Sequence, residues 1–335
     1  MTPFFQSDSL KFSYFNFIKE WEENPLICVK SSGSTGDAKE IFISKEQMIL
    51  SASKTIDFFN LKPKTKALLC LSMETIAGKM MLVRSIVGKW NLTISEPNAN
   101  PLKEMNEEFD FAAFVPLQIQ NILDENPDKL KKINTIIVGG APISDELAEK
   151  LKMNEITVYQ TFGMTETVSH IALRKIGNDS EKQYTTLKGI TVSENEGELI
   201  VNYPEMFEKN LETNDLVKIC APNKFEWLGR ADFIINSGGI KLNPEQIENK
   251  LSRILNLSFF LVGLPDHSLG TKLALILEEN EDFSISKKQL QQVLDKYEIP
   301  KVYAVVNSFN RTESGKINRR QTLKNIDSTN WKTIH

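Results

Sequence analysis

The stretch QTFGMTET, residues 160–167, carries several side chains suited to binding a nucleotide. It follows a short β-rich run, and ligands of open α/β sheets bind at the carboxyl ends of the strands. Phe162 offers a flat apolar face for a base, and Gly163 lets backbone approach a ligand closely. Thr165 can donate its hydroxyl proton to a phosphate oxygen, and Glu166 can coordinate a hard cation such as Mg²⁺. Taken alone, the stretch is equally compatible with a polar loop after a strand.

A second segment, residues 31–39 (SSGSTGDAK), combines hydroxyls, glycines and a lysine. Glycines let backbone N–H groups face an anion, and hydroxyls and a cation can supplement them. The segment does not fit the Walker pattern, because Gly36 and Lys39 are three residues apart and a strand-like run follows. It is a candidate phosphate-binding loop, with a flexible Ser/Gly loop as the alternative. Its candidate contacts are Ser31, Ser32, Gly33, Ser34, Thr35, Gly36 and Lys39.

Further candidates lie farther along the chain. The run VGGA at residues 138–141 could place an adenine against backbone, although a plain strand-to-helix turn is the simpler interpretation. Asp215 follows a turn and could hold ribose hydroxyls, which Arg230 could also reach; singly, either is more often a surface charge. Lys316 lies on a glycine-containing loop and matters only if that loop can swing into the site.

The elements that must position these residues follow from the alternation of strands and helices. Strands are predicted at 66–72, 92–96, 109–115 and 134–138, and helices at 77–88, 117–123 and 144–152. This alternation is typical of an α/β protein with a doubly wound, mostly parallel sheet. An aromatic amphipathic helix is predicted to end before Asn24, and Ser44 with Gln47 forms a capping box for another helix.

After His170 the pattern changes. Short strands at 197–202, 216–220 and 225–228 indicate a small β subdomain. Beyond it, Asn243 and Pro244 begin a capped helix, followed by strands at 259–263, 272–278 and 302–306 and a helix from Ser286. We predict a large N-terminal domain, residues 1–229, and a small mobile α+β C-terminal domain, residues 230–335.

Composition excludes several classes of protein. The chain of 335 residues is long enough for two or more domains, and its net charge of −4 argues against nucleic acid as a partner. Cys28, Cys70 and Cys220 lie far apart and are predicted to be reduced thiols. No apolar run approaches the ~18 residues of a membrane span, and the N-terminus lacks the pattern of a signal peptide. We therefore expect a cytoplasmic protein without membrane insertion.

Together and in this order, these motifs resemble the adenylate-forming superfamily of acyl-CoA ligases, synthetase adenylation domains and luciferases. The resemblance covers residues 31–320 and includes five motifs in family order. It implies an enzyme that uses ATP, CoA and Mg²⁺. A carboxylate attacks the α-phosphorus of ATP to give an acyl-adenylate and pyrophosphate, and the CoA thiol then displaces AMP to give the thioester.

The resemblance also implies a role for each residue. Those binding the nucleotide would be the segment 31–39 with Gly139, Gly140, Ala141, Phe162, Gly163, Asp215 and Arg230. The catalytic residues would be Thr165, Glu166 (the Mg²⁺ ligand) and Lys316. Asp232 would be the hinge of the small domain, and Ser237, Gly238 and Gly239 would line the pantetheine tunnel in the thioester-forming conformation.

Within the superfamily, residues 162–171 most resemble the 2-succinylbenzoate–CoA ligases of menaquinone (vitamin K2) biosynthesis, and the short N-terminal part agrees. Lys79 and Arg84 are five residues apart, so we expect at most one to point inward, a solvated charge being the alternative. 2-Succinylbenzoate has two carboxylates, of which only the one on the succinyl arm is activated. Arg84 is preferred as the partner of the other, the ring carboxylate, because its planar guanidinium can hold a carboxylate by two parallel hydrogen bonds. The candidate acid-binding residues are Thr75, Gly78, Lys79, Arg84, Ser169 and His170.

Four positions depart from the usual pattern. Ala38 replaces a proline, Asn214 a glycine, Phe162 a tyrosine, and Thr75 stands where many relatives carry His or an aromatic gate. None of them removes a charged catalytic group. Two alternatives remain open: a ligase for another aryl or short-chain acid, and a catalytically silent AMP- or acyl-binding protein. Homo-oligomer formation is also left open.

Overall fold

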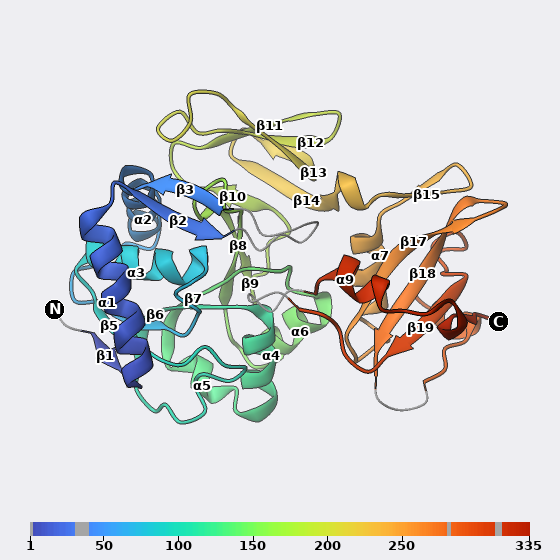
Figure 1. Cartoon of the computed structure of the whole chain (residues 1–335), viewed down its shortest axis with the longest axis horizontal. Coiled ribbons are helices and arrows are strands. Elements are labelled where there is room, and N and C mark those ends of the chain that lie inside the picture. The colour runs from blue at the N-terminus through green and yellow to red at the C-terminus, as the bar shows by residue number, and fades with distance from the viewer. Residues whose placement is uncertain (1–2, 31–39, 280–282, 312–316) are drawn as a thin grey trace.

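The computed structural model describes residues 3–30, 40–279, 283–311 and 317–335. Figure 1 shows a larger part, built on a 12-stranded sheet, beside a smaller part with a four-stranded sheet. The N-terminus lies at the far end of the larger part and the C-terminus at the far end of the smaller one. Among the described residues, no helix is long and apolar enough to cross a membrane.

One half of the large sheet is parallel. Its strands, in spatial order, are β1 (Phe4–Phe5), β5 (Asn91–Ile94), β4 (Lys66–Leu69), β6 (Phe109–Phe114), β7 (Ile133–Val138) and β8 (Val158–Gly163). Helices α1 (Asp8–Glu23), α2 (Lys45–Phe58) and α3 (Ile76–Gly88) cover one face, and α4 (Pro116–Glu125), α5 (Asp128–Lys131) and α6 (Asp145–Met153) the other. In β4, Ala67 and Leu69 pack toward the first group and Leu68 toward the second. The predicted doubly wound α/β fold is confirmed.

The other half of the sheet is antiparallel. It continues from β8 through β9 (His170–Ile176), β10 (Tyr184–Thr186), β14 (Lys224–Arg230), β13 (Leu211–Ala221), β12 (Glu198–Asn202) and β11 (Thr191–Asn195). The predicted small β subdomain therefore shares hydrogen bonds with the main sheet through β10, which pairs with both β9 and β14. Strand β13 begins at Leu211, five residues earlier than predicted, because Ile200 and Val201 of β12 pair with its first residues.

The strand before the nucleotide-binding stretch is longer than the sequence suggests. We expected it to end at residue 159, but β8 runs to Gly163. Its end pairs with β9 in antiparallel register, with a bulge between Phe162 and Gly163. Half of the stretch is thus strand, and only Met164 to Ser169 form the loop between β8 and β9.

A two-stranded hairpin flanks the candidate phosphate loop. Strand β2 (Leu26–Lys30) pairs antiparallel with β3 (Glu40–Ser44), and the register places residue 30 opposite residue 40. Residues 31–39 themselves lie outside the described residues. After the hairpin, Ser44 accepts the backbone N–H of Gln47, whose side chain accepts that of Ser44, so the predicted capping box of α2 is confirmed.

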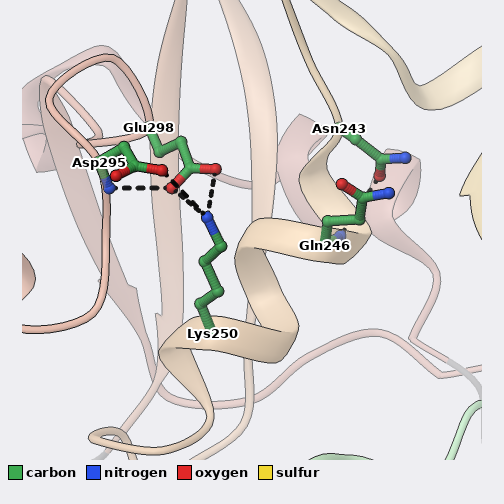
Figure 2. Close-up of polar contacts among 5 residues, drawn as sticks. All are labelled: Asn243, Gln246, Lys250, Asp295 and Glu298. Atoms are coloured by element: carbon green, nitrogen blue, oxygen red, sulfur yellow. Dashed lines mark hydrogen bonds and ion pairs between the residues drawn. The ribbon is translucent and has the colours of Figure 1, made fainter.

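The smaller part has its own cores. Its sheet contains β17 (Phe259–Asp266), β18 (Gly270–Glu278), β19 (Val302–Val306) and β20 (Lys332–Thr333), and its other elements are η1 (Ala231–Phe233), β15 (Ile235–Ser237), β16 (Ile240–Leu242), α7 (Pro244–Leu251), α8 (Lys287–Leu290), α9 (Arg319–Lys324) and η2 (Ser328–Asn330). Asn243 caps α7, as predicted. Figure 2 shows Lys250 of α7 binding Glu298 at 2.7 Å, which connects this helix to the segment before β19.

Polar contacts join the two parts. The Arg253 guanidinium lies 2.7 Å from the Asp145 carboxylate, and Asn243 donates to the Leu228 carbonyl at 2.7 Å. Polar junctions of this kind are typical of domains that move relative to each other. The division predicted between residues 229 and 230 stays a prediction; β14 continues one residue past it.

Candidate active site

The loop between β8 and β9 is held by a buried threonine. Met164 N–H donates to the Thr167 hydroxyl at 2.9 Å, and this hydroxyl lies 2.7 Å from the Ser169 carbonyl oxygen. Val168 has a φ of 67°, a left-handed conformation that is costly for a β-branched residue, about 1–3 kcal/mol. Such strain persists only where the surroundings determine the backbone, so the loop has a defined shape.

The two predicted catalytic residues of this loop have free polar groups. Glu166 is exposed, and neither its carboxylate nor the Thr165 hydroxyl bonds to another residue in the described part of the chain. No group of three or more metal-ligating side chains occurs among the described residues. Mg²⁺ typically takes one or two carboxylates and completes its shell with phosphates and water, so the donor set fits a cation that accompanies a nucleotide.

Gly163 is required by the chain's own backbone. A Cβ at this position would lie 2.3 Å from the Ser169 carbonyl oxygen and 2.5 Å from the His170 Cα. We expected the glycine to admit a ligand, whereas the close approach observed is that of the returning strand β9. Phe162 is half-buried and packs edge-on against Phe225 and Tyr184, with centroids 5.0 and 5.6 Å away.

The Gly-Gly-Ala run follows the strand next to the one that carries Phe162. Strands β7 and β8 are parallel neighbours, with Val138 opposite Gln160, so the segments that follow them meet at one edge of the sheet. Gly140 and Ala141 are exposed there, and Gly140 has a φ of 89°. A Cβ on Gly139 would lie 2.4 Å from the hydroxyl oxygen of Thr161. The structure thus brings together the residues predicted to flank the adenine.

The predicted ribose residues are neighbours, but Arg230 is engaged elsewhere. Asp215 and Arg230 are opposite each other on β13 and β14. Asp215 is buried, accepts the Trp227 indole N–H at 2.8 Å, and has its pKa raised by burial. Arg230 instead forms two bonds of 2.9 Å with Asp232, the predicted hinge.

A glutamate that the sequence did not indicate contacts the backbone of Arg230, close to the predicted hinge. Glu245 accepts the backbone N–H of Arg230 at 2.6 Å, and burial raises the pKa of this carboxyl to about 7. Its position at the start of α7 gave only the signal of an ordinary capped helix.

The predicted pantetheine residues form an exposed turn. Ser237 is the last residue of β15, and the exposed Gly238 and Gly239 connect it to β16 with φ values of 59° and 84°. This pair of positive φ angles is typical of a type I′ hairpin turn. The remaining predicted residues lie outside the described part of the chain: Ser31, Ser32, Gly33, Ser34, Thr35, Gly36, Lys39 and Lys316.

Two of the predicted acid-binding residues build the start of α3. The Thr75 hydroxyl accepts the backbone N–H of Gly78 at 3.3 Å and donates to the Ser72 carbonyl at 2.8 Å. A Cβ on Gly78 would lie 2.1 Å from the same carbonyl oxygen, so the turn admits only glycine. Thr75 is therefore an N-cap in this structure.

Our expectation that at most one of Lys79 and Arg84 points inward was wrong. Both are buried, as is every residue of α3 from Gly78 to Ser85, so the helix has no solvated face for this stretch. Lys79 lies near the N-terminal helix, with its ammonium 3.0 Å from the Glu20 carboxylate. The ammonium also donates to the Cys28 carbonyl at 3.0 Å, so its charge is already paired.

Arg84 has a different environment. Its side chain is 2% exposed, and no carboxylate among the described residues lies within ion-pair distance of it. It donates to the Ser169 hydroxyl at 2.7 Å and to the Thr55 hydroxyl at 3.3 Å. Its Nη2 lies 3.5 Å from His170 Nδ1. Burial lowers the pKa of Arg84 to about 10. The structure thus joins Arg84, Ser169 and His170 and places Lys79 elsewhere.

Thr55 is the residue of this cluster that the sequence interpretation missed. It lies on α2 and is fully buried. The buried positions of that helix, Met48, Ser51, Ala52 and Thr55, have helical spacing and include two hydroxyls. Polar residues on an otherwise apolar stripe were the available signal.

Comparison with known proteins agrees with this geometry. Residues 16–202 match the family model "AMP-binding enzyme". The 2-succinylbenzoate–CoA ligases of Listeria monocytogenes and Staphylococcus aureus (strain Newman) are 24% and 26% identical, over 87% and 88% of this chain and 68% and 66% of their own lengths. The chain thus spans about two thirds of these relatives.

Solved structures give the same result. The acyl-CoA synthetase (AMP-forming)/AMP-acid ligase II-like protein of Dyadobacter fermentans is 35% identical over 93% of both chains, with a TM-score of 0.62. The o-succinylbenzoate CoA synthetase of Bacillus subtilis, in complex with the acyl-adenylate intermediate OSB-AMP, is 21% identical over 90% of this chain and 69% of its own, with a TM-score of 0.77. With its family match over residues 16–202, the chain belongs to the AMP-binding enzyme family and is an AMP-forming acid–CoA ligase.

Proposed function

We propose that the acid is 2-succinylbenzoate and the product 2-succinylbenzoyl-CoA, a step of menaquinone biosynthesis. The observation that carries this proposal is the environment of Arg84, a buried cation without an anionic partner among the described residues. The names of the curated relatives from Listeria and Staphylococcus support the same acid.

The chemistry of this acid matches the unpaired cation. 2-Succinylbenzoate has two carboxylates, and the one on the succinyl arm is activated. The ring carboxylate stays anionic and needs a cation that orients it. A buried guanidinium without a counter-ion is costly, and a bound carboxylate offsets that cost. The Ser169 hydroxyl, which accepts from Arg84, keeps its own proton to donate to the same carboxylate.

The cofactors proposed are ATP, CoA and Mg²⁺. Gly140, Ala141 and Phe162 would contact the adenine, and Asp215 the ribose, with Arg230 joining it once released from Asp232. Thr165 would bind the α-phosphate and Glu166 the cation. Bound Mg²⁺ would neutralise phosphate charge while the acid carboxylate attacks.

The second half-reaction would use the smaller part of the chain. We propose that this part, residues 230–335, rotates about Asp232. The rotation would withdraw Lys316 from the phosphates and bring the turn of Ser237, Gly238 and Gly239 to the thiol of CoA. The polar junction between the two parts supports such a movement.

The proposal is tested with a panel of acids and two variants, Arg84→Met and Lys79→Met. The panel includes 2-succinylbenzoate and an analogue without the ring carboxylate, with ATP–pyrophosphate exchange and CoA thioester as readouts. Arg84→Met should lower kcat/KM for the diacid by about 2–4 kcal/mol, roughly 30- to 700-fold, and much less for the analogue.

Lys79→Met is the matched control, because it removes a buried cation from the same helix. Lys79→Met leaves Glu20 without its partner and should therefore reduce stability. Any change that it causes in kcat/KM should be the same for both acids. If Arg84→Met also loses the same factor on both acids, Arg84 does not bind the ring carboxylate. Activity confined to other acids would identify another acyl-CoA ligase, and AMP binding without exchange would identify a silent binder.

A further inference from the structure

Four polar side chains form a buried cluster where α2, α3 and the start of β9 meet. Arg84 comes from α3, Thr55 from α2, Ser169 from the end of the loop after β8, and His170 from the start of β9. Thr55 is fully buried, and Arg84 and His170 are 2% and 6% exposed. Buried polar groups of this kind must satisfy one another's hydrogen bonds.

The donors and acceptors of Thr55 fix the proton of the His170 imidazole. The Thr55 hydroxyl has a single proton and lies 3.2 Å from the Ser51 carbonyl oxygen, one helical turn earlier, to which it donates. It accepts the Arg84 Nε–H at 3.3 Å. His170 Nε2 is 3.2 Å from the same hydroxyl, whose proton is already used, so Nε2 must carry the hydrogen and donate.

The other ring nitrogen must then accept. His170 Nδ1 faces Arg84 Nη2 at 3.5 Å, and a guanidinium has only donors. A proton on Nδ1 would place two N–H groups against each other. Both partners thus require a neutral imidazole with its proton on Nε2. Burial, with the Arg84 charge, also keeps the pKa of His170 well below its usual value.

This network accounts for three of the five N–H groups of Arg84. Nε–H goes to Thr55, and the two N–H groups of Nη2 go to Ser169 and His170. The two N–H groups of Nη1 have no partner among the described residues. The guanidinium is thus held through Nε and Nη2, and Nη1 keeps its hydrogen-bonding capacity with respect to the described residues.

We propose that Thr55 and His170 are positioning residues that fix the guanidinium of Arg84, leaving Nη1 and the Ser169 hydroxyl to bind the ring carboxylate of the acid. The assignment of the ligand rests on the function proposed above, whereas the tautomer of His170 does not. Because His170 contributes an acceptor and no charge, it orients Arg84 without repelling it.

The first test reads the tautomer directly. The chain has three histidines, so ¹⁵N spectra of the full-length protein contain few imidazole signals, and His170→Gln identifies those of His170. The expected result is a neutral ring with the proton on Nε2 and an unprotonated Nδ1. A proton on Nδ1, or a charged ring at neutral pH, would overturn the proposal, and neither outcome depends on any substrate.

The second test separates positioning from folding. Thr55→Val removes the hydroxyl at nearly constant volume, Thr55→Ser retains it, and Thr186→Val is the matched control for losing a buried threonine hydroxyl, here one bonded to the Ile190 carbonyl. Thr55→Val should raise KM for 2-succinylbenzoate about tenfold with kcat nearly unchanged, since the contact is remote from the reacting carboxylate. The analogue without the ring carboxylate should change less than about twofold, and Thr55→Ser should restore the wild-type KM.

The outcomes are distinguishable. Equal changes for both acids, or no rescue by serine, contradict positioning by Thr55. If the wild-type enzyme does not prefer the diacid, the proposed substrate fails while the tautomer result stands. If Thr55→Val does not fold, the tautomer measurement decides, because it needs no Thr55 variant and a proton on Nδ1 or a charged ring overturns the proposal.

Discussion

Two cations of one helix show why individual residues must be judged by their partners. Lys79 and Arg84 are both buried in α3, and burial alone would make either a candidate for binding an acid. Lys79 is neutralised by Glu20, whereas in the described part of the chain the hydrogen-bond partners of Arg84 are two hydroxyls and an imidazole. Sequence spacing could not reveal this difference, because Glu20 is 59 positions away from Lys79. The proposal for Arg84 therefore rests on its lack of an anionic partner among the described residues, and not on its spacing from Lys79.

Glu166→Gln tests the proposed cation ligand. A neutral amide is a poorer ligand for a hard cation, so we expect the variant to need more Mg²⁺ and to form acyl-adenylate more slowly. The measurement is a Mg²⁺ titration of ATP–pyrophosphate exchange. Glu149→Gln, on α6, is the control. A wild-type Mg²⁺ dependence in Glu166→Gln would show that Glu166 does not bind the cation.

His170 should make stability depend on pH. Its pKa in the folded protein lies well below the ordinary value of 6.5, so below pH 6.5 the unfolded chain binds a proton that the folded protein does not. The free energy of unfolding should therefore fall as pH drops below 6.5. Denaturant unfolding of wild type and His170→Gln across this range measures the effect, and the difference between the two should shrink at lower pH. A constant difference would mean that His170 is not held neutral.

At the scale of single elements, the sequence predicted features that depend on neighbouring residues, such as helix caps, and missed features that depend on pairing with a distant strand. The caps at Ser44 and Asn243 were predicted because the bonds that form them join residues two or three apart. The extension of β8 to Gly163 was missed because it depends on pairing with β9. The burial of α3 could have been predicted, since apolar residues surround Lys79 and Arg84 on all sides of the helix, and such helices are normally buried. The prediction weighed Lys79 and Arg84 singly and overlooked that rule.

The start of α3 allows a test of whether Thr75 is a cap or an acid-pocket gate. Thr75→Ala removes the acceptor of the Gly78 N–H and should cost about 0.5–2 kcal/mol of unfolding free energy, while Thr75→Ser should cost much less. Urea denaturation measures both, and KM for the acid is measured alongside. A stability like wild type together with a changed acid preference would assign Thr75 to the pocket instead.

At the scale of the whole molecule, the two parts meet through polar contacts near Asp232, the proposed hinge, which binds Arg230. The two bonds from Arg230 to Asp232, with Glu245 on the Arg230 backbone, keep this arginine at the junction. If Arg230 binds the ribose as proposed and leaves Asp232 to do so, nucleotide binding and the geometry of the proposed hinge would be coupled. The sequence suggested roles for Arg230 and Asp232 but not the ion pair between them, which depends on how β14 ends and η1 begins.

Lys316→Ala tests the use of the smaller part in alternating half-reactions. If this lysine serves adenylation only, its loss should slow acyl-adenylate formation about 10²–10³-fold, the usual effect of removing one donor to a developing charge. Thioester formation from supplied acyl-adenylate should change far less, because the lysine would be withdrawn from the site in that step. Lys324→Ala, an exposed lysine on α9, controls for the loss of charge in the same part. Single-turnover assays of the two half-reactions give the comparison, and equal damage to both would contradict rotation about Asp232.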